Sequence, residues 1–171
     1  CMAPLNVQGW AERHVVIEAG DRSLVGVFSE PDHLEDVARV VLLPNSGSLN
    51  HIGPNRLGVK LSRELAKVGV ATLRFDLGEL VTSRARRPDE QSDPNPETTL
   101  ADVAACVTWV CDHRPDVSIS IADLCSEDQT ALRAAMDLPS SAIDHVVSIN
   151  PLSLQIAGDA ICHGRTVVDG T

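Results

Sequence analysis

The sequence predicts an α/β fold with a mostly parallel sheet and helices on both faces. Short runs rich in β-branched residues alternate with longer segments of helical periodicity. Two of the runs, 39–43 and 70–75, are almost continuously apolar, as in strands that are buried on both faces. A chain of 171 residues with 43% hydrophobic side chains is long enough for one domain with a real core, so we expect a single domain over residues 1–171.

The expected elements follow the order ββ, βα, βα, βα, β. Residues 14–19 and 23–29 predict an opening antiparallel hairpin around the turn at 20–22. Strands 39–43 and 70–75 flank a helix with apolar residues at helical spacing: Leu57, Leu61, Leu65 and Val68.

The second half of the chain repeats this alternation. A helix starts near Leu100, with Thr98 or Thr99 as its cap and Pro115 as its stop. The remaining elements are a strand at 118–122, a helix at 127–136 and a strand at 143–149.

Residues 84–97 have no apolar periodicity and contain Pro88, Pro94 and Pro96, which predicts a loop. Such an insertion is either a mobile surface loop or a ligand-binding segment at the carboxyl ends of the strands. Residues 152–171 are expected to form a C-terminal tail.

Charge and composition disfavour several classes of function. The net charge of −10 and pI near 4.9 argue against nucleic acid or an anionic membrane as a partner, and the basic cluster at 84–87 is too short to reverse this. Neither a glycine-rich dinucleotide motif nor a phosphate loop occurs, so a nucleotide-binding domain is disfavoured. We expect no metal and no cofactor, because neither a His-x-x-x-His pair nor a carboxylate cluster at metal spacing is present.

The cysteines suggest a reducing compartment. The five cysteines form no CxxC pair, which indicates neither a disulfide framework nor a zinc site. No stretch approaches the roughly 18 apolar residues of a membrane span. We therefore expect a cytoplasmic protein with reduced thiols.

The most informative stretch is 118–135, where an apolar strand runs through Cys125 into a helix. This is the arrangement of a nucleophile elbow, which normally reads Gly-x-nucleophile-x-Gly. Here the five residues read Asp123-Leu124-Cys125-Ser126-Glu127. A thiol occupies the nucleophile position, and two carboxylates replace the small residues.

Together with three other segments, this elbow resembles the α/β-hydrolase superfamily, especially its serine aminopeptidase-like and exosortase-associated branch. Residues 42–54 resemble the loop after the third strand of that family, 73–77 the end of the fourth strand, and 149–151 the end of the sixth. The resemblance implies a three-layer fold and hydrolysis of an ester, thioester or amide bond by Cys125. It also implies a small acyl substrate, with an oxyanion hole formed by amides near Ser46 or Gly47 and Ser126.

The sequence also departs from the family pattern. The family continues through two more strands that carry the catalytic acid and histidine, whereas this sequence reaches Thr171 soon after the sixth, so we expect a fold truncated at about that strand. The protein is then either an impaired hydrolase or a non-catalytic binding or scaffolding protein derived from one.

The sequence offers two histidines as the general base for Cys125. His51, in the loop after the third strand, could serve as the base or could instead order that loop, and His163 is the other candidate. Cys125 itself is either the nucleophile or an inert buried thiol. Asp123 and Glu127 place negative charge beside it, which disfavours a thiolate and predicts slow alkylation.

The strand at 143–149 is expected to lie at the edge of the sheet with little charge to block pairing. Either the tail at 152–168 covers it or a second copy pairs with it, which would make a homodimer.

Overall fold

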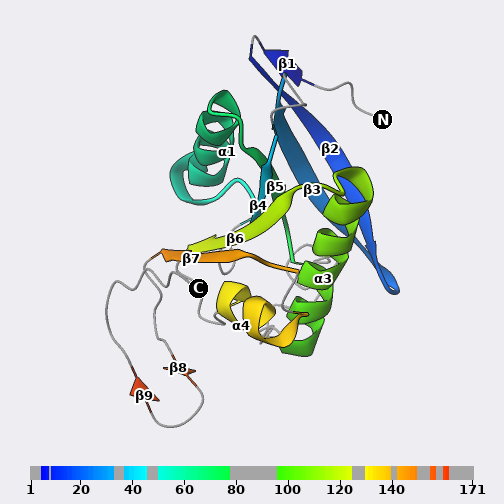
Figure 1. Ribbon diagram of the computed structural model, residues 1–171, viewed down its shortest axis with the longest axis vertical. Helices are drawn as coiled ribbons and strands as arrows, with labels where there is room; N and C mark the ends of the chain where they lie inside the picture. The colour runs from blue at the N-terminus through cyan, green and yellow to red at the C-terminus, as the bar shows by residue number, and fades with distance from the viewer. Residues whose placement is uncertain are drawn as a thin grey trace, which may run out of the picture.

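Seven strands form one sheet in the computed structural model, in the order β1-β2-β3-β5-β4-β6-β7 (Figure 1). The structure describes residues 5–7, 9–32, 37–45, 50–77, 96–124, 130–139, 142–149, 155–156 and 160–161. The strands of the sheet are β1 (Leu5–Val7), β2 (Trp10–Ala19), β3 (Arg22–Pro31), β4 (Arg39–Pro44), β5 (Ala71–Phe75), β6 (Ser118–Leu124) and β7 (His145–Ile149).

The sheet combines an antiparallel half with a parallel half. β2 and β3 form the expected hairpin, in register from Trp10 opposite Pro31 to Ala19 opposite Arg22, and β3 pairs antiparallel with β5. β5, β4, β6 and β7 are then parallel to one another. Five of the seven strands, all except β1 and β3, thus run in the same direction, which confirms the mostly parallel α/β sheet. The hairpin is longer at both ends than the sequence predicted.

Helices cover both faces of the sheet. A single 3-10 turn, η2 (Pro54–Arg56), leads into α1 (Leu57–Lys67), and the other helices are α3 (Pro96–His113) and α4 (Thr130–Asp137). Adjacent side chains of β2 point to opposite faces: Glu12 reaches Arg63 of α1, while the Arg13 guanidinium lies 5.8 Å from the ring of Trp109 in α3. Figure 1 accordingly shows α1 on one side of the sheet and α3 and α4 on the other.

The core lies mainly between the sheet and α3 and α4. Its largest fully buried apolar side chains are Ile17, Leu24, Phe28, Val40, Leu42, Leu73, Phe75, Val103, Val110 and Ile121. The continuous apolar runs of β4 and β5 supply residues to this core, which is why they carry no alternating pattern.

Two expectations about element boundaries are wrong, and a third is not tested. α3 begins at Pro96, so Pro96 and Glu97 belong to a helix and not to the loop predicted at 84–97, of which residues 84–95 lie outside the described residues. Proline suits a first helical turn because its fixed φ matches the helix and its missing N–H would be unpaired there. Thr98 and Thr99 consequently lie inside α3 and do not cap it. The next helix was predicted to start at residue 127. Its described part starts at Thr130, and residues 127–129 lie outside the described residues.

Short strands were not anticipated. β1 adds three residues beside β2, and β8 (Gln155–Ile156) pairs with β9 (Ala160–Ile161) in a separate two-stranded sheet within the predicted tail. Segments of two or three residues are too short for a periodic pattern to be recognised.

β7 terminates the described seven-stranded sheet, as expected, and pairs only with β6 there. Its side chains Val147 and Ile149 are 49% and 41% exposed. Most of residues 152–168, which were expected to cover this edge, lie outside the described residues. None of the helices in the described ranges is long and apolar enough to cross a membrane.

Candidate active site

The loop that follows β4 is fastened to the end of β5 at both of its described ends. Asn45 donates its backbone N–H to the carbonyl of Phe75 at 3.0 Å, and its side-chain oxygen accepts the N–H of Leu77 at 2.8 Å. Beyond residues 46–49, which lie outside the described residues, the loop resumes at Asn50 and is fastened again at His51. The two attachments therefore fix where this loop leaves the sheet and where it returns.

The second attachment is a histidine–carboxylate pair. Asp76, directly after β5 and 5% exposed, lies 2.6 Å from Nδ1 of His51 through Oδ2 and accepts the backbone N–H of His51 through Oδ1. The carboxylate thus binds both the ring and the main chain of one residue. This orients the imidazole and fixes the turn at 50–53.

Two glycines allow this turn to pack on the start of α1. Gly53 adopts φ of 73°, which is strained for other residues. A Cβ on Gly58 would lie 2.7 Å from the carbonyl oxygen of His51, so only glycine lets the helix approach so closely. The loop is thereby held between β5 and the first turn of α1.

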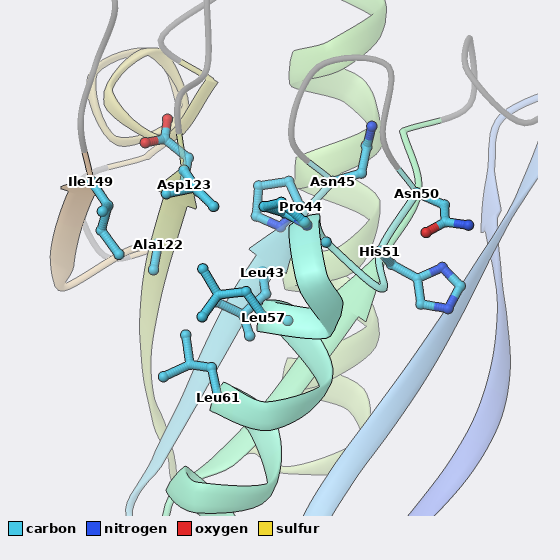
Figure 2. Close-up of a pocket in the computed structure, with 14 residues that line it drawn as sticks. Leu43, Pro44, Asn45, Asn50, His51, Leu57, Leu61, Ala122, Asp123 and Ile149 are labelled. Atoms are coloured by element: carbon cyan, nitrogen blue, oxygen red, sulfur yellow. The ribbon is translucent and has the colours of Figure 1, made fainter.

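A mostly apolar pocket lies between this loop and the end of β6. Its cavity volume is about 50 Å³, and it opens to solvent. Figure 2 shows Leu43, Leu57, Leu61 and Ala122 gathered on one side of it. The pocket also touches Leu124, the last described residue before Cys125.

Asp123 lies at this end of β6 with its carboxylate directed away from the leucines and toward α4 (Figure 2). Its Oδ2 accepts the N–H of Ala131 at 3.2 Å, and its Oδ1 accepts the hydroxyl of Ser148 at 2.9 Å. Burial raises the pKa of Asp123 above its ordinary value, although both hydrogen bonds oppose this shift.

Among solved structures, the described arrangement is similar to enzymes of one fold. A dienelactone hydrolase from Anabaena variabilis matches with a TM-score of 0.63 at 20% identity over 85% of this chain and 62% of its own. An α/β serine hydrolase without a lid from Xanthomonas campestris matches with a TM-score of 0.62 at 19% identity over 94% of this chain and 69% of its own. This protein has the α/β-hydrolase fold. Comparison of the sequence with protein-family models and with curated proteins gave no match.

The length of the α/β-hydrolase relatives exceeds that of this chain. It spans 62% of the dienelactone hydrolase and 51% of Est1E from Butyrivibrio proteoclasticus, which matches with a TM-score of 0.63 at 18% identity over 81% of this chain. The recognition of the fold from the elbow and its neighbouring segments is confirmed. The shared fold by itself assigns no chemistry.

Most of the residues predicted for the site lie outside the described residues. These are Ser46, Gly47, Cys125, Ser126 and His163. β6 ends at Leu124 and the described part of α4 starts at Thr130, so the elbow prediction for Cys125 falls on residues outside the described ranges and stays a prediction. Of the other cysteines, Cys106 is buried and Cys111 is exposed.

His51 is the predicted site residue that the structure describes. Its partner Asp76 follows β5, and β4 lies between β5 and β6, so two strand spacings of about 4.8 Å each separate Asp76 from the end of β6. Figure 2 shows the His51 ring extending away from Asp123. Of the two roles that the sequence left open, this geometry favours ordering of the loop.

Sequence reasoning missed two features of the site. The first is the contact between Asp76 and His51, because the sequence analysis assigned Asp76 only to a strand end. The available signal was that a carboxylate after one parallel strand and a histidine in the loop after the neighbouring strand meet at the same edge of the sheet. The second is Asp123, which the sequence analysis treated only as a charge and not as a hydrogen-bond acceptor for α4 and β7. Within the described ranges, no three His, Cys, Asp or Glu side chains lie close enough to hold a metal ion.

Proposed function

We propose that this protein hydrolyses the ester, thioester or amide bond of a small acyl substrate through Cys125. The observation that carries this proposal is the position of the apolar pocket, which touches the last residue of β6 before Cys125. A thiolate there would attack the carbonyl of a substrate whose apolar group occupies the pocket and would expel the alcohol, thiol or amine. Water would then hydrolyse the acyl-cysteine and release the acid and the free thiol. Among the structural relatives, a cold-adapted esterase and an α/β serine hydrolase homologue from Coxiella burnetii agree with this class of reaction.

The loop after β4, which is bound to the end of β5, supports the same proposed function. Ser46 and Gly47 directly follow Asn45, whose main chain and side chain are both bound to the end of β5. We propose that amides near these residues and Ser126 hold the oxyanion, because such donors must be fixed before charge develops on the carbonyl oxygen. His51 then orders the loop, and His163 is the proposed base. Free thiols persist in reducing compartments, and we propose that the protein lies in the cytoplasm.

A binding or scaffolding role is the second candidate. It is supported by Asp123, because a carboxylate two residues before Cys125 disfavours the thiolate whenever it is ionised. In that case the pocket would hold a small apolar ligand without cleaving it.

Turnover of p-nitrophenyl acetate and butyrate distinguishes the two functions. We expect release of p-nitrophenol above the buffer rate by the wild-type protein and loss of that activity in Cys125→Ser. Cys106→Ser and Cys111→Ser are matched controls, since one removes a buried thiol and the other an exposed thiol, and both should keep the activity. Absence of turnover, together with slow labelling of Cys125 by iodoacetamide, would favour the binding role.

A further inference from the structure

One buried carboxylate joins three elements next to the proposed nucleophile. Asp123 belongs to β6 and stands opposite Ser148 of β7 in the register of the sheet, where it accepts the serine hydroxyl at 2.9 Å. Its other oxygen accepts the N–H of Ala131, in the first turn of α4, at 3.2 Å. The side chain therefore connects β6 both sideways to β7 and forward to the helix.

This connection is well sheltered. Asp123 is 3% exposed, and each of its carboxylate oxygens has a hydrogen-bond donor. The N–H groups of a first helical turn lack partners within the helix, so an acceptor from outside stabilises the start of the helix, and a negative charge there is favoured by the helix dipole. Glycine, the residue of the family pattern at this position, could make neither bond.

The hydrogen bond to Ala131 also closes a short segment of chain. Asp123 and Ala131 are eight residues apart, and Cys125 lies between them. Whatever fixes these two residues to one another fixes both ends of the segment that carries the thiol.

We propose that Asp123 is a positioning residue for the proposed reaction, because its carboxylate binds β7 and links the end of β6 to the first turn of α4, the two elements between which Cys125 lies in the sequence. The inference rests on the proposed function only in taking Cys125 as the reacting group. Where the family pattern has a glycine that lets strand and helix pack closely, this protein has the carboxylate of Asp123, which links strand and helix by a hydrogen bond.

The test compares Asp123→Ala, which removes both bonds, with Asp123→Asn, whose amide can accept from Ala131 and donate to Ser148. Native-state amide exchange at Ala131 should be about tenfold faster in Asp123→Ala, which corresponds to the loss of one hydrogen bond. The rate of Cys125 alkylation by iodoacetamide should rise by about tenfold, and kcat for p-nitrophenyl acetate should fall by a similar factor while KM changes by less than about twofold. Asp123→Asn should stay within about threefold of wild type in Ala131 exchange and in kcat. Its Cys125 alkylation should rise by less than that of Asp123→Ala, because both variants lose the carboxylate charge but only Asp123→Ala loses the two hydrogen bonds.

Two further variants separate positioning from general destabilisation. Asp144→Ala removes a bond of the same kind at the opposite end of β6, where Oδ2 of Asp144 accepts the N–H of Ile119 at 2.9 Å, and it should leave Ala131 exchange and Cys125 alkylation unchanged. Ser148→Ala removes only the link to β7 and should raise both rates by less than Asp123→Ala does. If Asp123→Ala does not fold, Ser148→Ala decides the question in its place.

The inference is wrong if amide exchange at Ala131 in Asp123→Ala equals that of wild type, or if Asp123→Asn changes the three measurements as much as Asp123→Ala does. Where Ser148→Ala is used in place of Asp123→Ala, the inference is wrong if neither Ala131 exchange nor Cys125 alkylation changes. If the wild-type protein hydrolyses nothing, the proposed function fails separately. The pattern of Cys125 alkylation across the variants still decides the positioning role.

Discussion

Glu12→Gln should destabilise the protein by about 3–5 kcal/mol, the cost observed when one partner of a buried ion pair is removed. Glu12 is 8% exposed on β2 and accepts hydrogen bonds from Arg74 of β5 at 3.2 Å and from Arg63 of α1 at 2.9 Å. Arg74 is 3% exposed, and its burial lowers the pKa of its guanidinium. The substitution would leave this cation buried without its counter-charge, and urea unfolding at pH 7 measures the loss.

The effect should depend on pH in a defined direction. Burial acts to raise the pKa of Glu12, but the hydrogen bond from Arg63 and the charge of Arg74 outweigh it and hold the pKa below the ordinary 4.5. A carboxyl with a lowered folded pKa contributes stability that is present above its unfolded pKa and lost as the pH falls through the folded one. The difference between wild type and Glu12→Gln should therefore shrink below about pH 4.5.

Glu18→Gln is the matched control on the same strand. Glu18 is exposed and accepts only the hydroxyl of Ser23 at 3.0 Å, so its loss should change the free energy of unfolding by less than about 0.5 kcal/mol. A cost for Glu12→Gln as small as that of the control would show that the Glu12–Arg74 pair contributes little to stability.

The sheet was predictable because the pattern of apolar residues in a strand depends on which of its faces are buried. The apolar runs of β4 and β5 are typical of strands covered on both sides, and the structure places a helix layer on each face. The start of α3 was not predictable in the same way. Pro96 in a proline-rich stretch indicates a loop, and only the helix that follows shows that this proline is in the first turn.

Buried polar residues were the least predictable part of the fold. Glu12, Arg74 and Asp123 interrupt or flank apolar patterns, and nothing in their spacing shows which residues form hydrogen bonds with them. Glu12 and Arg74 are 62 residues apart in sequence, and their pairing depends on β2 and β5 both lying beneath α1. Such contacts are fixed by topology, which a local pattern does not contain.

In the candidate site, too, local features could be predicted from the sequence and contacts between distant residues could not. The strand that ends at Leu124 and the helix that includes Thr130 could be predicted from local sequence, and the elbow at Cys125 between them stays a prediction. The contact between His51 and Asp76 instead requires β4 and β5 to be neighbours in the sheet although α1 separates them in the chain. The sequence could name the loop and the strand end but not the bond between them.

Asp76→Ala should destabilise the protein by about 2–4 kcal/mol, because it removes the acceptor of two hydrogen bonds, one from the ring and one from the main chain of His51. The turn at 50–53 would lose its attachment to β5, and amide exchange at Ile52 and Gly53 should accelerate. Asp32→Ala is the matched control, since Asp32 accepts the N–H of Gly9 at 2.8 Å in an exposed turn and should cost less than about 1 kcal/mol.

The same pair of residues decides between the two roles of His51. If His51 orders the loop, His51→Ala and Asp76→Ala act on one contact, and the double variant should lose about as much stability as Asp76→Ala alone. Both variants should then lower kcat/KM for p-nitrophenyl acetate by a similar factor and keep the shape of its pH profile. A base would behave differently, because His51→Ala would remove the acidic limb of the profile while Asp76→Ala preserved it. That second pattern would return His51 to the catalytic machinery and require its ring to turn away from Asp76 toward β6.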